Sequence, residues 1–289
     1  MISVSGKIWT EQKVNKNLIE KFKQDYGLGD VLSKLIISRN YDSSEIHGIN
    51  NKQKLINIFK DDKDFQKASL ILLKAINNNQ NICILGDYDV DGACSTSLLV
   101  RYFNYINQKH FFYIPDRTED GYGASKKLFQ KLILKKPKLV IMVDCGSTSN
   151  EAIDYLNKHQ IKSIIIDHHE INKPYPKSNV IINPKKGSIK KENSLLCATA
   201  LTYFFIETII QKTKSNFKIS NFLIYVLLAT VCDVMPLRKI NRIIAHNSID
   251  NLNIKNYVAL NYIFEQYNLK KKITIDDLGF LIGPIINAG

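Results

Sequence analysis

Aspartates and histidines follow short apolar runs at several places in the sequence, which is a pattern typical of a metal site. The groups that follow residues 82–85, 139–143 and 163–166 are, in turn, Asp87, Asp89 and Asp91; Asp144; and Asp167, His168 and His169. Asp233, which ends the apolar run 227–232, is a further candidate ligand. Carboxylates gathered at one place repel one another unless protons or cations separate them.

The types of these residues indicate which cation they would bind. A mixture of aspartate oxygens and one or two imidazoles suits Mn²⁺ or Mg²⁺ rather than a cysteine-rich zinc site. Two such ions, held roughly 3.5–4 Å apart, activate water and stabilise a phosphoryl leaving group. Adjacent residues of an extended chain point in different directions, so we expect at most one of His168 and His169 to reach a given metal. The other would lie behind the ligands or bind phosphate.

The segments that must position these groups alternate between strand and helix from Asp64 onward. Strands are predicted at 82–85, 111–114, 139–143, 163–166 and 180–182, and helices between them at 94–106, 125–134 and 150–159. This alternation predicts a parallel α/β sheet, and the almost wholly apolar runs fit strands that are covered on both faces. Because the carboxyl ends of parallel strands form the ligand crevice, we expect the acids and histidines to converge there.

Helical patterns flank this alternating region on both sides. Further helices are predicted at 17–26, 30–38, 195–210 and 222–231. Thr148 with Glu151, and Thr274 with Asp277, have the spacing of a capping box. This spacing predicts that a helix starts at each of the two threonines.

The composition is that of a globular protein with an excess of positive charge. Forty Lys and Arg against 27 Asp and Glu give a net charge of +13, which makes a polyanion a candidate partner. The apolar fraction of 45% argues against overall disorder. The five cysteines form no CxxC pair, which predicts reduced, buried thiols and a cytoplasmic protein. We find no apolar core of a signal peptide and no stretch long enough to span a bilayer.

Another segment has residues that are suited to binding phosphate. Arg117 follows the second predicted strand, and the sequence Gly121-Tyr122-Gly123-Ala124-Ser125 opens the next predicted helix. A guanidinium offers a fork for phosphate oxygens, and the backbone amides of a helix start offer a second anion cradle. The alternative interpretation is an ordinary loop with a surface arginine.

Each acidic group taken singly has a simpler explanation. The spacing of Asp87, Asp89 and Asp91 resembles the first half of a calcium EF-hand loop, but Leu98 stands at the twelfth position, where a glutamate is required. Asp144 alone would be interpreted as a helix cap, and Asp233 as a loop residue after a helix. Their co-occurrence at successive element ends is what favours a metal site.

In order and spacing these residues resemble the motif series of the DHH phosphoesterases. The matching segments are 86–92, 114–117 with 121–123, 143–146, 167–169, 229–237, and 283–284 with 286–288. The opening residues 5–9 also resemble the branch of the family that degrades single-stranded DNA. The Asp-Tyr-Asp-x-Asp-Gly form of the first motif favours that branch, since relatives that act on small substrates usually have histidine early in the motif.

The resemblance implies a ligand set, a reaction and partners. The implied metal ligands are Asp89, Asp91, Asp144, His168 and Asp233, with Asp87 and His169 in the same site and Arg117 and His169 holding substrate phosphate. The implied reaction is hydrolysis of single-stranded DNA from its 5′ end to 5′-mononucleotides, in DNA repair and recombination, with two Mn²⁺ or Mg²⁺ ions. A helicase and a single-strand-binding protein are candidate partners of a monomeric enzyme.

The resemblance also implies an organisation in three parts. These are a helical N-terminal extension over 1–60, a DHH catalytic domain over 61–240, and a helical connecting segment over 241–289 that leads toward a second lobe. Family members continue into that lobe and into a nucleic-acid-binding β-barrel, so the chain resembles the N-terminal portion of a longer protein. Ile285 stands where the family often has arginine, which leaves no guanidinium for a phosphate contact there.

Two other functions stay open at this point. One is a DHH enzyme that acts on short oligonucleotides, cyclic dinucleotides or pyrophosphate. The other is a catalytically inactive DNA-binding scaffold. The complete set of acids argues against a scaffold, since clustered carboxylates are costly to keep.

Overall fold

The computed structural model describes residues 2–8, 10, 12–51, 53–116, 118–120, 123–187, 189, 193–250, 252–267 and 271–288. The chain forms two compact units, Met1–Lys54 and Leu55–Gly289. The helices of the first unit are α1 (Lys16–Tyr26), α2 (Asp30–Ser38) and α3 (Ser43–Asn50). Leu28, Ile36 and Ile46 form a small core within this unit. The two helices predicted near the N-terminus are therefore present.

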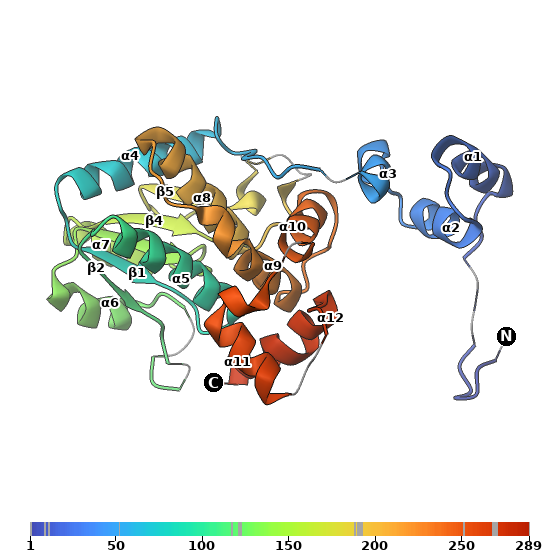
Figure 1. Cartoon of the computed structure of the whole chain (residues 1–289). Helices are drawn as coiled ribbons and strands as arrows, with labels where there is room; N and C mark the ends of the chain where they lie inside the picture. The colour runs from blue at the N-terminus through green and yellow to red at the C-terminus, as the bar shows by residue number, and fades with distance from the viewer. Residues whose placement is uncertain are drawn as a thin grey trace. The chain divides into compact units, whose positions relative to one another are not determined.

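A five-stranded parallel sheet forms the centre of the second unit (Figure 1). Its strands are β1 (Ile82–Leu85), β2 (His110–Tyr113), β3 (Leu139–Val143), β4 (Lys162–Ile166) and β5 (Val180–Ile182). Their order across the sheet is β2-β1-β3-β4-β5, so β1, β3 and β4 are neighbours. The predicted fold class is confirmed, and each predicted strand is present to within one residue.

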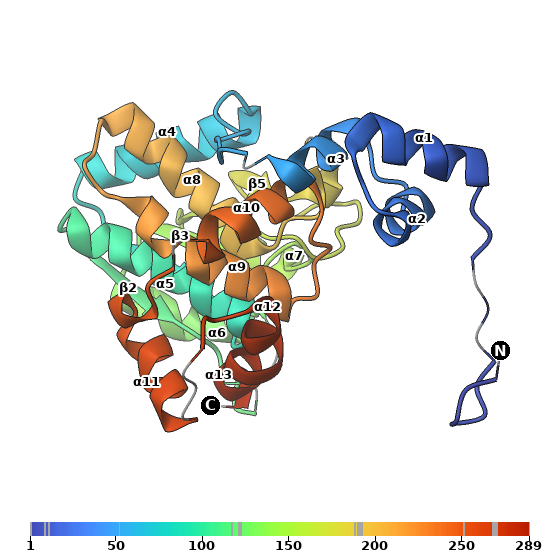
Figure 2. The same cartoon turned by 45° about the vertical axis from the view of Figure 1, so that its right-hand side comes forward.

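Helices cover both faces of this sheet, as the apolar strands require (Figure 2). Successive residues of β1 show the two faces: Ile82 and Ile84 pack into one core, and Cys83 and Leu85 pack into the other. The helices of the first core are α4 (Lys63–Asn77), α5 (Val90–Tyr105), α8 (Ala198–Thr213), α9 (Leu223–Cys232) and α10 (Lys239–Ile249). Those of the second are α6 (Lys126–Leu132) and α7 (Asn150–Lys158).

The C-terminal part of the second unit is helical. It contains α11 (Val258–Gln266), α12 (Ile275–Asp277), a π-helix η6 (Leu278–Ile282) and α13 (Gly283–Ala288). Short 3₁₀ turns occur at η1 (Ile133–Lys135), η2 (Pro184–Lys186), η4 (Ile219–Phe222) and η5 (Ile254–Asn256). α13 packs against both α5 and α9. No helix among the described residues is long and apolar enough to cross a membrane.

The two predicted capping boxes have different outcomes. Thr274 and Asp277 form the box, with each side chain bonded to the backbone amide of the other residue. The helix predicted at 150–159 is present as α7, but the capping box at Thr148 is wrong, because the residue before the helix is Ser149, whose side chain makes no capping bond. The chain turns tightly through Asp144 (φ 60°) and Gly146 (φ 107°) just before this helix, and the helix starts one residue later than the spacing predicts.

Stability should depend on the central strand far more than on the nearby surface. Ile141→Ala, in the fully buried β3, is expected to lower the free energy of unfolding by about 2–5 kcal/mol, because it leaves a cavity. Leu134→Ala, at a side chain that is 78% exposed, should change it by about 0.5 kcal/mol or less. Urea denaturation of both variants makes the comparison, and equal losses would contradict this account of the core.

Candidate metal centre

The predicted acids and histidines lie together at the carboxyl edge of the sheet. Asp144 and Asp167 directly follow β3 and β4, and Asp87 follows β1 after one glycine. Because these strands are neighbours, their ends bring the side chains close together. Asp233 reaches the same place from the C-terminal end of α9. Convergence at one edge, the central prediction from the sequence, is therefore observed.

Carboxylates from three elements converge on the imidazole of His168. Its Nε2 atom lies 3.2 Å from Oδ2 of Asp233, 3.3 Å from Oδ1 of Asp144 and 3.6 Å from Oδ2 of Asp91. Burial lowers the pKa of His168, although the Asp91 carboxylate opposes this change. A neutral imidazole carries one proton, so it satisfies at most one of these three carboxylates.

The acids of the centre are costly in their ionised form. Asp144 is fully buried, and its two carboxylate oxygens accept no hydrogen bond from a described donor. Burial raises the pKa of Asp144 well above its usual range, and the charges of Asp91 and Asp89 raise it further. Burial and the same two charges raise the pKa of Asp233 to about 7. Burial also raises the pKa of Asp87. A bound cation would favour the ionised forms.

Asp91 holds an adjacent helix in place as well as facing His168. Its Oδ2 and Oδ1 atoms accept hydrogen bonds from the backbone amides of Ala198 (2.7 Å) and Thr199 (2.8 Å), the first two residues of α8. The hydroxyl of Thr199 donates to the backbone oxygen of Asp91 at 2.9 Å. The first amides of a helix lack partners within it and favour a negative charge. Asp91 therefore joins the start of α5 to the start of α8.

Asp89 caps α5 beside it. Its Oδ1 atom accepts from the amide of Gly92 at 2.9 Å, and the amide of Val90 donates to Oδ1 of Asn287 at 3.1 Å. A Cβ atom at Gly92 would overlap the backbone of Asp87, so the turn between these acids requires glycine. The first motif is thus packed so tightly that its carboxylates have fixed positions.

Asp167 anchors the histidine pair, a role that the sequence did not reveal. Its side chain accepts from the backbone amides of Ser147, His168 and His169, and its Oδ1 atom lies 2.8 Å from Nδ1 of His169. Although burial opposes it, these hydrogen bonds hold the pKa of Asp167 well below its usual range. The hydrogen bond between Asp167 and His169 raises the pKa of His169, which favours the imidazolium form. The signal was present, because Asp167 opens the Asp-His-His triplet.

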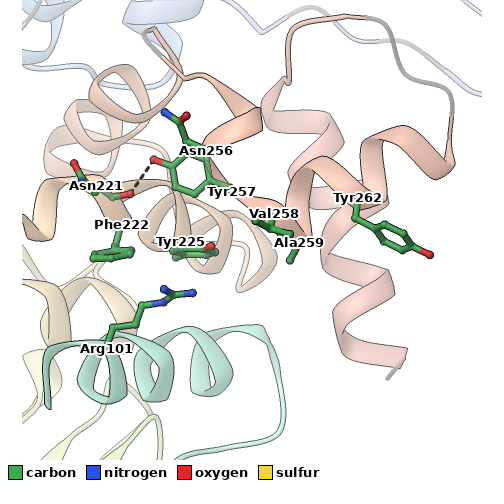
Figure 3. Close-up of a pocket in the computed structure, with 9 residues that line it drawn as sticks. All are labelled: Arg101, Asn221, Phe222, Tyr225, Asn256, Tyr257, Val258, Ala259 and Tyr262. Carbon is green, nitrogen blue, oxygen red and sulfur yellow. Dashed lines mark hydrogen bonds between the residues drawn. The ribbon is translucent and has the colours of Figure 1, made fainter. Parts of the chain in front are cut away.

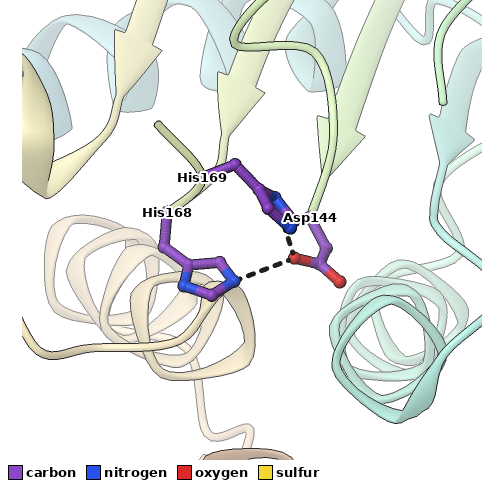
Figure 4. Close-up of side chains that lie close together, drawn as sticks. All are labelled: Asp144, His168 and His169. Carbon is purple, nitrogen blue, oxygen red and sulfur yellow. Dashed lines mark ion pairs between the residues drawn. The ribbon is translucent and has the colours of Figure 1, made fainter. Parts of the chain in front are cut away.

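The two histidine side chains face the same carboxylate, although adjacent residues were expected to point in different directions (Figure 4). The expectation that at most one of them reaches a given metal stays a prediction. Nε2 of His168 lies 3.3 Å and Nδ1 of His169 lies 3.7 Å from the same Oδ1 atom of Asp144. The backbone after β4 is bent around Asp167 rather than extended, since Asp167 accepts from the amides of both histidines. Nδ1 of His169 is hydrogen-bonded to Asp167, whereas neither ring nitrogen of His168 has a hydrogen-bond partner among the described residues.

Asn183 is a further residue that the sequence analysis missed. It is fully buried after β5, and its Nδ2 atom donates to Oγ of Ser147 (2.7 Å) and to the backbone oxygen of His169 (3.0 Å). It therefore links the loops that follow β3, β4 and β5. An asparagine followed by proline at the end of an apolar run was the available signal.

The backbone is unusual at two positions of the centre. Asp144 and Val234 have φ of 60° and 53°, in the left-handed region. For the β-branched Val234, directly after Asp233, this conformation is a strong outlier and costs on the order of 1–3 kcal/mol. Strain of this kind persists only where the surrounding structure imposes it. Both residues lie where a candidate ligand is presented.

The donor set fits a hard divalent cation. Three groups each offer ligand atoms within 4.8 Å of one another: Asp144, His168 and His169; Asp91, His168 and Asp233; and Asp87, Asp89 and Asp144. Both ring nitrogens of His168 and Oδ2 of Asp233 are buried without a hydrogen-bond partner, as are both oxygens of Asp144. Burial raises the pKa of Cys232 to about 11, so this nearby thiol stays protonated and is a poor ligand. Arg117, Gly121 and Tyr122, predicted to bind phosphate, lie outside the described residues.

A family comparison agrees with this geometry. The model of the DHH family, N-terminal domain, matches residues 81–230, which is more than half of the chain. The chain belongs to the DHH family, as the motif series predicted. The match begins just before β1 and ends within α9, so it contains the three strand ends that supply the centre.

Curated proteins that are similar to this chain include RecJ exonucleases from two bacteria. The single-stranded-DNA-specific exonuclease RecJ of Haemophilus influenzae is 29% identical over 236 residues, covering 77% of this chain and 41% of the relative. RecJ of Bacillus subtilis is 23% identical over 283 residues, covering 97% of this chain and 35% of the relative. The chain thus spans about two-fifths of the length of the curated relatives it matches.

The solved structures agree on the fold. The crystal structure of exonuclease RecJ bound to manganese has a TM-score of 0.72 and 24% identity, covering 81% of this chain and 59% of that one. The structure of RecJ from Thermus thermophilus in complex with Mn²⁺ has a TM-score of 0.77 and 18% identity, covering 94% of this chain and 38% of that one.

Asp91, which is hydrogen-bonded, and Asp144, which is not, should respond differently to the same substitution. Asp91→Asn removes one acceptor from the start of α8 and is expected to lower the free energy of unfolding by about 2 kcal/mol. Asp144→Asn, without divalent metal, should leave it unchanged or raise it, because a buried carboxylate without a donor is replaced by a neutral amide. Denaturant titration in EDTA tests both, and a large loss in Asp144→Asn would overturn this division.

The contribution of Asp233 to stability without metal should fall as pH rises. The pKa of Asp233 is raised to about 7, so the folded state binds its proton more tightly than the unfolded state does. This contribution is complete below the unfolded pKa and is lost as pH rises through the folded pKa. In EDTA, we expect the free energy of unfolding to change less between about pH 4 and about pH 8 in Asp233→Asn than in the unmodified protein, by on the order of 2 kcal/mol. Thermal unfolding across that range is the measurement; parallel curves for the two proteins would contradict it.

Proposed function

We propose that this chain carries the catalytic centre of a metal-dependent phosphodiesterase that hydrolyses single-stranded DNA from its 5′ end to 5′-mononucleotides. The observation that carries the proposal is the convergence of buried ligand atoms without hydrogen-bond partners: both carboxylate oxygens of Asp144, both ring nitrogens of His168 and Oδ2 of Asp233. The similarity to proteins named single-stranded-DNA-specific exonuclease RecJ supports the choice of substrate. We also propose a role in DNA repair and recombination, as the motif resemblance implies.

We infer that the centre binds two ions, Mn²⁺ or Mg²⁺. Two of the ligand groups share no residue: Asp87, Asp89 and Asp144 form one, and Asp91, His168 and Asp233 form the other. RecJ structures have been determined with Mn²⁺ and with Mg²⁺, which supports these metals. Such ions, when bound, lower the pKa of water and stabilise charge on the phosphoryl group.

The protein's own groups have separate tasks in this proposal. Asp144 and His168 present ligand atoms from adjacent strand ends, and the rigid first motif positions Asp89. His169, whose pKa is raised by Asp167, would donate a hydrogen bond to a substrate phosphate as the imidazolium. Arg117 is proposed to hold a second phosphate oxygen.

The remaining proposals concern organisation and partners. We propose a helical extension over 1–60, a catalytic domain over 61–240 and a connecting segment over 241–289. We also propose a monomer that acts in the cytoplasm on single-stranded DNA beside a helicase and a single-strand-binding protein. The similarity to proteins named for single-stranded DNA supports the nucleic-acid partner.

Nucleotide release from end-labelled strands tests the proposed function. The protein with Mn²⁺ should release labelled mononucleotide at once from 5′-labelled single-stranded DNA, and only late from 3′-labelled DNA. Asp144→Asn should reduce the rate by at least about 100-fold, because it removes a ligand common to two of the groups.

Two controls define the result. Leu134→Ala, on the exposed surface, should retain the rate of the unmodified protein. Competition between long 5′-phosphorylated DNA and dinucleotides separates a strand-degrading enzyme from one that acts on short substrates. Faster cleavage of dinucleotides, or release that Asp144→Asn leaves unchanged, would overturn the proposal.

A further inference from the structure

An aromatic pocket lies near the C-terminal end of α5 and the start of α9. Figure 3 shows the residues that line it. The volume of the pocket is about 770 Å³, which is within the range of ligand pockets. α5 begins beside Asp91 and contributes Arg101 near its C-terminal end. α9, which packs against α5, ends at Asp233 and contributes Tyr225 near its start. The ten residues from Asp91 to Arg101 correspond to about 15 Å of helix.

The pocket presents flat surfaces around a cation. The guanidinium carbon of Arg101 lies 5.2 Å from the ring centroid of Phe222 and 5.9 Å from that of Tyr225. These two rings are inclined by only 21°. Tyr257 closes one side, where its hydroxyl donates to the backbone oxygen of Asn221 at 2.8 Å. Tyr262, on α11, is 61% exposed and completes the lining.

The pocket carries one positive charge and no negative charge among the described residues that line it. Arg101 is the charged residue, and the other lining residues are aromatic, amide or aliphatic. Arg101 makes no ion pair with an acid among the described residues, and its Nε atom reaches only Oγ of Ser97, at 3.4 Å. Its charge is therefore not neutralised by the part of the chain that the structure describes.

These features select one kind of ligand. A planar, polyanionic ligand satisfies both the aromatic faces and the positive charge, whereas an apolar segment would leave Arg101 without a counter-charge. Aromatic side chains beside basic residues are the common means of binding single-stranded nucleic acid, because every base has a face on which to stack. Asn221 and Asn256 also line the pocket, and a side-chain amide can donate and accept hydrogen bonds.

We propose that this pocket binds a nucleobase of the single strand whose end lies at the metal centre. The proposal rests on the proposed function, because the substrate strand is what brings bases to the pocket. A base held about 15 Å from the centre belongs to a nucleotide several positions from the strand end. The pocket would then favour long strands over dinucleotides and would not touch the scissile bond.

The test is the affinity for fluorescent single-stranded DNA, measured by anisotropy with the whole chain in EDTA. Tyr262→Ala should weaken binding of a long strand by about 5- to 30-fold, because one stacking surface is lost. Arg101→Ala should weaken it by a similar factor. Tyr267→Ala is the matched control, since this tyrosine is 55% exposed and lies at the end of the same helix outside the pocket. It should bind like the unmodified protein.

Each outcome separates the two proposals. Unchanged affinity in both pocket variants, or an equal loss in Tyr267→Ala, would overturn the pocket proposal. Mn²⁺-dependent release by the unmodified protein would leave the proposed function standing in that case. If the unmodified protein releases no nucleotide from any strand, but the pocket variants bind the long strand more weakly than the unmodified protein does, the proposed function fails and the base-binding pocket stands. Equal weakening for a dinucleotide and a long strand would also overturn the pocket proposal, since a dinucleotide at the centre does not reach it.

Discussion

The cost of holding several carboxylates at one buried edge is the constraint on which this structure depends. The protein resolves it differently for different acids. Asp91 and Asp167 are satisfied by fixed backbone donors, the amides of α8 and those of the loops after β3 and β4. Asp144 accepts no hydrogen bond from a described donor, and burial raises the pKa of both Asp144 and Asp233. The first pair has fixed hydrogen-bond donors within the protein, whereas the second pair requires a proton or a cation.

This division explains why the centre is both rigid and reactive toward cations. Asp91 joins two helix starts, and Asp167 together with Asn183 ties the three loops after β3, β4 and β5. These links oppose a movement of the unsatisfied groups that would relieve their repulsion. The left-handed backbone at Asp144 and Val234 is a further sign that the surrounding structure holds these residues in place. A bound cation would remove the repulsion between carboxylates whose positions folding has already fixed.

The sequence predicted the strands, the edge and the acids, because these follow from local apolar runs and from a general property of parallel sheets. It did not predict the separate roles of the acids. Asp91 meets α8 across more than a hundred residues, and Asn183 joins loops from different strands, so neither contact has a local pattern. The orientation of the His169 side chain was predicted incorrectly for a related reason. Its backbone follows the hydrogen bonds of Asp167 and not the extended geometry assumed for adjacent residues.

The C-terminal segment contacts the residues next to two candidate ligands. The side chain of Asn287 accepts from Val90, the residue after Asp89. A Cβ atom at Gly283 would overlap Sγ of Cys232, the residue before Asp233, so this glycine permits the close approach of α13 to the end of α9. One short helix thus fixes the two segments that present Asp89 and Asp233. Because these acids belong to different candidate ligand groups, the position of α13 would help to set the separation of the two proposed ions.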